Sequence, residues 1–193
     1  NGGFVAGAVV MTTLIVSFLS YSASVLHGGA VSPLAWAIAS GVSLGLGLGV
    51  WIFYYRKERG TSLWIPRGMA RFLSERTKST KHAAESFSLG LTSVVAELLF
   101  IVGPAAIASF ALVSLPEDLQ LLGIALYVFI ASLPLLVVFV MVGSGHKLSR
   151  IQRWREDNKR FLQFAAGSAL AVLGFYVYVN EVVVATVAVA GAL

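Results

Sequence analysis

The carboxyl group of Glu97 is the only ionisable side chain deep within an apolar stretch of this sequence. Placing a carboxylate at the centre of a bilayer is costly, so such a residue usually faces a helix bundle, a water-filled cavity or a partner. Ser93, Gly90 and Ser86 precede it at helical spacing and would form a small polar stripe on the same face. The pattern favours a cation or proton site. The other interpretation is a protonated glutamic acid that hydrogen-bonds a neighbouring helix.

Two prolines lie in the apolar stretches around this acid. Pro104 follows Gly103, and Pro134 lies two residues after Ser132. A proline within a helix removes a backbone hydrogen bond and kinks the helix. Carbonyls freed at a broken membrane helix can coordinate cations or line a substrate site, although prolines in such helices also serve packing alone. The candidate transport or ion-binding residues are therefore Glu97, Ser93, Gly103, Pro104, Ser132 and Pro134.

A glycine repeat points to close helix packing rather than to chemistry. Gly41, Gly45 and Gly49 recur every four residues, and this spacing puts them on one face of a helix. Small residues at this spacing let two membrane helices approach closely. We therefore predict a helix-packing face at these three glycines.

The composition indicates that these residues lie in membrane-spanning helices. The chain has 193 residues, of which 58% are hydrophobic and 12% charged, whereas soluble domains carry about 25% charged residues. A membrane helix needs about 20 mostly apolar residues. We predict an all-α transmembrane bundle in one domain over residues 1–193, with about five spanning helices near Phe4–Leu26, Leu34–Tyr55, Ser86–Leu112, Leu119–Val142 and Phe161–Val179.

The two ends of the chain leave the number of helices open. Residues 182–193 are apolar but too few to span a membrane alone. They either extend the fifth helix or begin a sixth. The first residue is Asn1 rather than methionine, so either the chain is trimmed or a segment before it is missing. Pro116, with Glu117 and Asp118 after it, is expected to start the fourth span.

The basic residues predict the orientation of the helices. All 14 lysines and arginines fall between Arg56 and Lys81 or between Lys147 and Arg160. Such clustering is typical of cytoplasmic loops. We therefore expect cytoplasmic basic loops at 56–85 and 144–160, with the C-terminus outside. Residues 64–76 of the first loop form either an amphipathic helix on the membrane surface or a plain solvated loop.

Several kinds of chemistry have no support in the sequence. There is no cysteine, which excludes disulfides and thiolate metal sites. The three histidines lie near helix ends or in loops, and His27 and His146 are expected on opposite sides, which disfavours haem. No metal-ligand cluster, phosphate loop or hydrolase triad is present. We expect no enzyme activity, no cofactor and no metal. The basic loops suit membrane lipids, and we expect no nucleic-acid partner.

The third span contains Phe87-Ser-Leu-Gly-Leu-Thr and, further on, Ile101-Val-Gly-Pro104-Ala-Ala-Ile. This segment resembles the pivotal helix of the DsbD/CcdA-like proteins, which belong with the LysE-type transporters. The basic loop before this span, Leu133-Pro134-Leu in the fourth and the glycine-rich last helix (Gly167, Gly174) extend the resemblance over roughly residues 34–180.

The resemblance implies six helices in two inverted three-helix repeats, with both termini outside. The present chain would then lack the first helix. The redox members carry a cysteine just before the Gly-Pro pair, where this chain has Phe100, Ile101 and Val102. Thiol electron transfer is therefore excluded, and the resemblance implies the transporter branch.

Two functions remain open from the sequence. The first is an integral membrane transporter or exporter of a small solute or cation, with Glu97 as the charged residue. The second is a non-catalytic membrane subunit of a larger complex, which the sparse polar residues and the glycine face would suit. A homodimer or other membrane subunits are the expected protein partners.

Overall fold

The computed structural model describes residues 2–28, 30–53, 83–145 and 148–190. Within these ranges the secondary structure is entirely helical, which confirms the predicted all-α class. Residues 64–76, where a surface helix was one of two expectations, lie outside the described ranges. The elements are α1 (Gly2–His27), α2 (Pro33–Phe53), α4 (Ala83–Ala96), α5 (Leu98–Val113), α6 (Glu117–Gly143), α7 (Leu148–Asp157), α8 (Lys159–Val177), the π-helical η1 (Tyr178–Val183) and α9 (Val184–Ala190).

Local sequence signals set the ends of several helices. Gly28 follows α1 with a φ of 59°, a left-handed conformation that suits glycine, and its N–H donates to the Ser24 carbonyl at 2.9 Å. Pro116 caps α6, and Glu117 and Asp118 occupy its first turn, as predicted. Residues 184–190 continue the last helix through η1, so this part of the chain extends the fifth span.

The described helices provide about five membrane spans, as predicted. Four segments are long and apolar enough to cross a membrane, and α4 with α5 makes a fifth if this bent pair counts as one span. In each of these four segments, at most 33% of the residues in an 18-residue apolar stretch are buried inside the chain. Most of their apolar surface is therefore available to lipid or to other membrane proteins.

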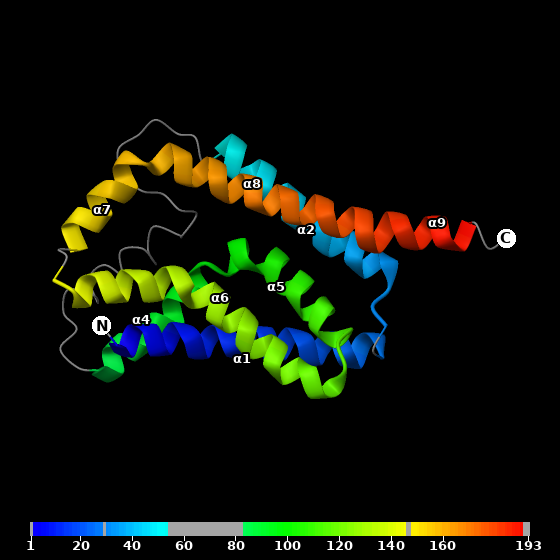
Figure 1. Cartoon of the computed structure of the whole chain (residues 1–193), viewed down its shortest axis with the longest axis horizontal. Coiled ribbons are helices and arrows are strands. Elements are labelled where there is room, and N and C mark those ends of the chain that lie inside the picture. The colour runs from blue at the N-terminus through cyan, green and yellow to red at the C-terminus, as the bar shows by residue number, and fades with distance from the viewer. Residues whose placement is uncertain (1, 29, 54–82, 146–147, 191–193) are drawn as a thin grey trace.

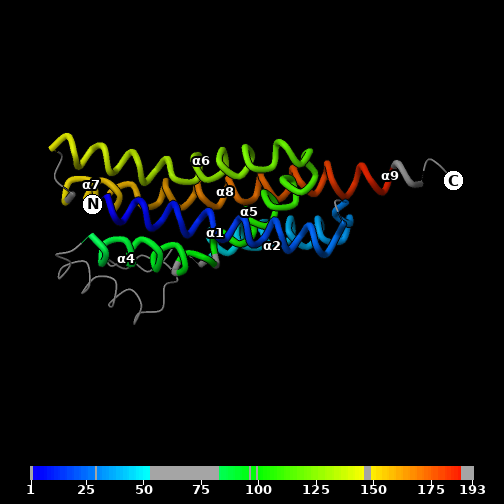
Figure 2. The backbone as a smooth tube through the Cα atoms, turned by 90° about the horizontal axis from the view of Figure 1, so that it is seen from below, coloured from blue at the N-terminus to red at the C-terminus, as the bar shows by residue number. Residues whose placement is uncertain are grey.

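The helices pack as two pairs with α5 between them. Figure 1 shows α2 beside the rod formed by α8, η1 and α9, with α1, α4 and α6 on the other side of α5. α1 runs parallel to α4, because Gly3 approaches Ala83 while Gly7 approaches Leu91. α2 runs antiparallel to α8. Figure 2 shows the two ends of the chain at opposite ends of the bundle.

Glycines allow the closest helix contacts. Gly7 of α1 and Gly90 of α4 lie against the backbone of the facing helix. Between α2 and α8, a Cβ built on Gly47 would lie 2.8 Å from the Gly167 carbonyl oxygen, and one built on Gly174 would lie 2.8 Å from the Ser40 carbonyl oxygen. Any side chain at these positions would force the helix pairs apart.

The predicted packing face of α2 is not the one that α8 uses. Side chains added at Gly41, Gly45 or Gly49 would meet no atom within 4 Å, whereas Gly47, on another face, contacts α8. The spacing argument identified the repeat but not the face that packs within the described chain. The repeat is left on the outside of the α2 and α8 pair.

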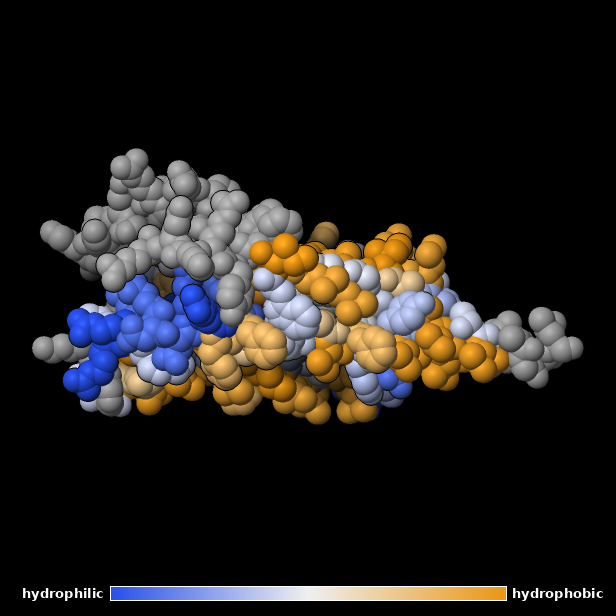
Figure 3. Space-filling model, turned by 90° about the horizontal axis from the view of Figure 1, so that it is seen from above, coloured by the Kyte–Doolittle hydropathy of each residue, from blue (hydrophilic) through white to orange (hydrophobic). Residues whose placement is uncertain are grey.

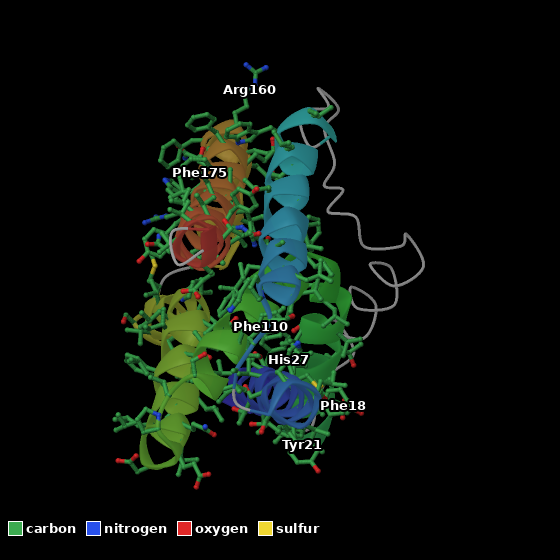
Figure 4. All side chains as sticks on the ribbon, turned by 90° about the vertical axis from the view of Figure 1, so that its right-hand side faces the viewer. Phe18, Tyr21, His27, Phe110, Arg160 and Phe175 are labelled. Carbon is green, nitrogen blue, oxygen red and sulfur yellow. The ribbon has the colours of Figure 1, made fainter. Side chains whose placement is uncertain are left out.

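The outer surface has the polarity expected of a membrane protein. Figure 3 shows hydrophobic residues along the sides of the bundle and hydrophilic residues gathered towards one end. In Figure 4, Phe18 and Tyr21 of α1 point away from the bundle, and their exposed fractions are 68% and 71%. His27 and Phe110 lie close together between α1 and α5, with ring centroids 5.8 Å apart.

A matched pair of substitutions on α2 tests this packing. Gly47→Val should destabilise the protein by about 1–3 kcal/mol, because the new side chain meets the α8 backbone. Gly45→Val adds the same side chain two residues away, where space is open, and should leave stability nearly unchanged. Thermal unfolding of the purified protein in one detergent measures both. Equal destabilisation by the two variants would contradict the assigned α2–α8 contact.

Candidate functional site

The third span is broken at Glu97. The segments Ala83–Val95 and Phe100–Val113 differ in direction by 83°. Glu97 is the single residue between α4 and α5, and its backbone makes the connection. Its N–H donates to the carbonyls of Ser93 and Val94 at 3.2 and 3.1 Å, and its carbonyl accepts from the Phe100 N–H at 2.9 Å.

We expected kinks at Gly103-Pro104 and at Pro134, and both prolines lie inside helices, Pro104 in α5 and Pro134 in α6. The second arm of the break begins at Phe100, four residues before Pro104, where a proline ring meets a helix carbonyl. α1 packs against both arms, and α5 has a further contact with α2. Gly90 docks α4 against α1, and a Cβ on Gly103 would lie 3.3 Å from Cα of Ser43 in α2.

The Glu97 side chain is accessible rather than enclosed. It is exposed in the isolated chain and makes no capping hydrogen bond to α5. A carboxylate left exposed at a break in an apolar span calls for water, a cation or another protein chain beside it.

The other candidate residues fall into separate helix contacts. Ser93 is half-buried, and its hydroxyl donates to the Gly90 carbonyl at 2.9 Å. Gly90 and Ser86 face α1, so the polar stripe predicted beside Glu97 is largely a packing surface. Gly103 faces α2, whereas Ser132 is buried in α6, which packs mainly against α1. Of the six candidates, Glu97 alone occupies the break, with Ser93 one turn before it.

Sequence reasoning missed two polar residues at the contacts of α8. The hydroxyl of Ser43 in α2 is fully buried and donates to the Leu170 carbonyl at 3.0 Å. Gln163 is 6% exposed, and its Nε2 atom has no hydrogen-bond partner among the described residues. A glutamine amid the apolar residues of the last span was the available signal.

The bundle end with the N-terminus of α8 has further aromatic and polar contacts. The Trp51 and Phe164 rings stack with centroids 6.0 Å apart, and Trp51 Nε1 donates to the Phe164 carbonyl at 3.3 Å. The segment 144–160, predicted as a loop, contains α7.

A shallow apolar groove runs along α8 between Leu44 and Phe175. The break at Glu97 is therefore the described feature best suited to a charged ligand.

The chain matches no protein-family model, no curated protein and no solved structure. The similarity to the DsbD/CcdA-like proteins thus stays a prediction from the sequence.

A distance measurement distinguishes tertiary docking from proline as the cause of the break. Ala84→Cys and Ser114→Cys, introduced together into this cysteine-free chain, would carry spin labels at the ends of the two arms. Added to this pair, Pro104→Ala should leave the label distance unchanged, because Gly90 and Gly103 still dock the arms. A straightened helix would instead lengthen the distance by roughly 10 Å at 1.5 Å per residue, which would assign the break to proline.

Proposed function

We propose that this chain is an integral membrane transporter or exporter of a small solute or cation, and that Glu97 binds the charged group. The break at Glu97 is the observation that carries this proposal. Helix ends leave backbone groups without partners inside the helix. In membrane transporters, such ends within a broken span bind ions and charged substrates. A carboxylate at the junction adds the negative charge that attracts a cation.

The proposal includes an orientation in the membrane. The packing directions put the end of α2 and the start of α8 at the same end of the bundle as the start of α4. The two basic segments would share that end, which we assign to the cytoplasm by the positive-inside rule. The C-terminal end of the last helix would then lie outside. Neither an enzymatic step nor nucleic acid forms part of this function.

Charge neutralisation at one position tests the transport proposal. Purified protein would be reconstituted in liposomes, and charge movement recorded after jumps of Na⁺, K⁺, Mg²⁺, Mn²⁺ or methylammonium. Glu97→Gln should reduce the flux of the transported cation on the order of 10- to 100-fold, since it removes a charge-assisted contact. Glu117→Gln makes the same change at an exposed position in the first turn of α6 and should leave the flux unchanged. Wild-type flux in a correctly folded Glu97→Gln variant would remove Glu97 from the mechanism.

A second candidate function is that of a non-catalytic membrane subunit. The face with Gly41, Gly45 and Gly49 favours it, because this face of α2 has open space on the described chain. A helix of another subunit could approach α2 closely there. Glu97 would in that case stabilise the assembly instead of binding a transported solute.

Gentle extraction from native membranes separates these two functions. The detergent-solubilised particle would be sized, and co-purifying proteins identified by mass spectrometry. The transporter proposal predicts a lone chain or a homodimer. Stoichiometric foreign subunits that are lost in Gly45→Leu but retained in Gly2→Leu, where space is also open, would establish the subunit function.

A further inference from the structure

The short helix α7 lies at the end of two membrane spans and packs little against the bundle. It follows the C-terminal end of α6 and precedes α8, and α8 is its main packing partner among the described elements. Figure 1 shows α7 at one end of the bundle, turned away from the line of α8. Because α6 and α8 are both long enough to cross a bilayer, their connection is placed at the height of the lipid headgroups.

The side chains of α7 are sorted by type around the helix. At 100° per residue, Ile151 and Trp154 are neighbours on one strip, and the Trp154 side chain is 55% exposed. Arg150 lies along one edge of this strip and Arg155 along the other. The opposite side carries the exposed residues Arg153 and Glu156, and Asp157 lies beside Arg150. The apolar strip thus has an arginine on each side, and Glu156 is kept away from it.

We propose that α7 is an interfacial helix that binds anionic phospholipid headgroups. Ile151 and Trp154 enter the boundary between headgroups and acyl chains, where an amphipathic helix buries its apolar face. Tryptophan suits this depth because its ring is apolar and its N–H is polar. Arg150 and Arg155 extend from the two edges to lipid phosphates, and Glu156 faces water.

The charge pattern selects an anionic lipid surface over a neutral one. Lysines and arginines near a cytoplasmic leaflet each gain from the negative surface potential. Guanidinium groups also form paired hydrogen bonds with phosphate oxygens. The proposal does not depend on transport, since it concerns only how the chain sits on its membrane.

Spin labels at single cysteines test the proposal in the intact protein. The chain has no cysteine, so Ile151→Cys and Glu156→Cys each provide one labelling position. In phosphatidylcholine liposomes that also contain phosphatidylglycerol, the label at position 151 should be accessible to oxygen and shielded from a water-soluble nickel complex. The label at position 156 should show the reverse. In liposomes of phosphatidylcholine alone, the label at position 151 should become more accessible to the nickel complex.

Two substitutions that each remove one positive charge then identify which arginine contacts the lipid phosphates. Added to Ile151→Cys, Arg150→Gln should lower the ratio of inserted to water-exposed label roughly fivefold in the anionic liposomes. Arg153→Gln removes the same charge from the opposite side and should have a smaller effect. Equal accessibility at positions 151 and 156, or no dependence on phosphatidylglycerol, would overturn the proposal. Shielding of position 151 from both oxygen and the nickel complex would show that protein, not lipid, covers the strip.

Discussion

The close approach of helix backbones at glycines is the constraint on which the rest of this structure depends. In a bilayer, burial of apolar side chains drives helix association little, because lipid tails are as apolar as leucine. Association relies on tight packing and on a few polar contacts. Gly7 and Gly90 permit such packing between α1 and α4, and Gly47 and Gly167 permit it between α2 and α8. The hydrogen bond from Ser43 to the Leu170 carbonyl lies within the second contact.

Glycine contacts also hold the two arms of the candidate site. α1 packs against both α4 and α5, and Gly103 gives α5 a further contact with α2. The segment changes direction before the contact with α2 is added. The change falls at Glu97, the residue for which a position inside an unbroken apolar helix would be most costly. The bend leaves this carboxylate exposed instead of surrounding it with apolar side chains.

The sequence predicted the helices well because their length and apolarity are local properties. The spans, the proline-capped start of α6 and the positions of Glu97 and Ser93 on the third span all follow from hydropathy and spacing. The 83° change of direction could not be predicted, because proline positions describe one helix at a time and the bend also depends on the helices packed against it. The face of α2 that α8 contacts was missed for a related reason. Gly41, Gly45 and Gly49 have the required spacing, but the partner helix that selects Gly47 is more than 100 residues away in the sequence.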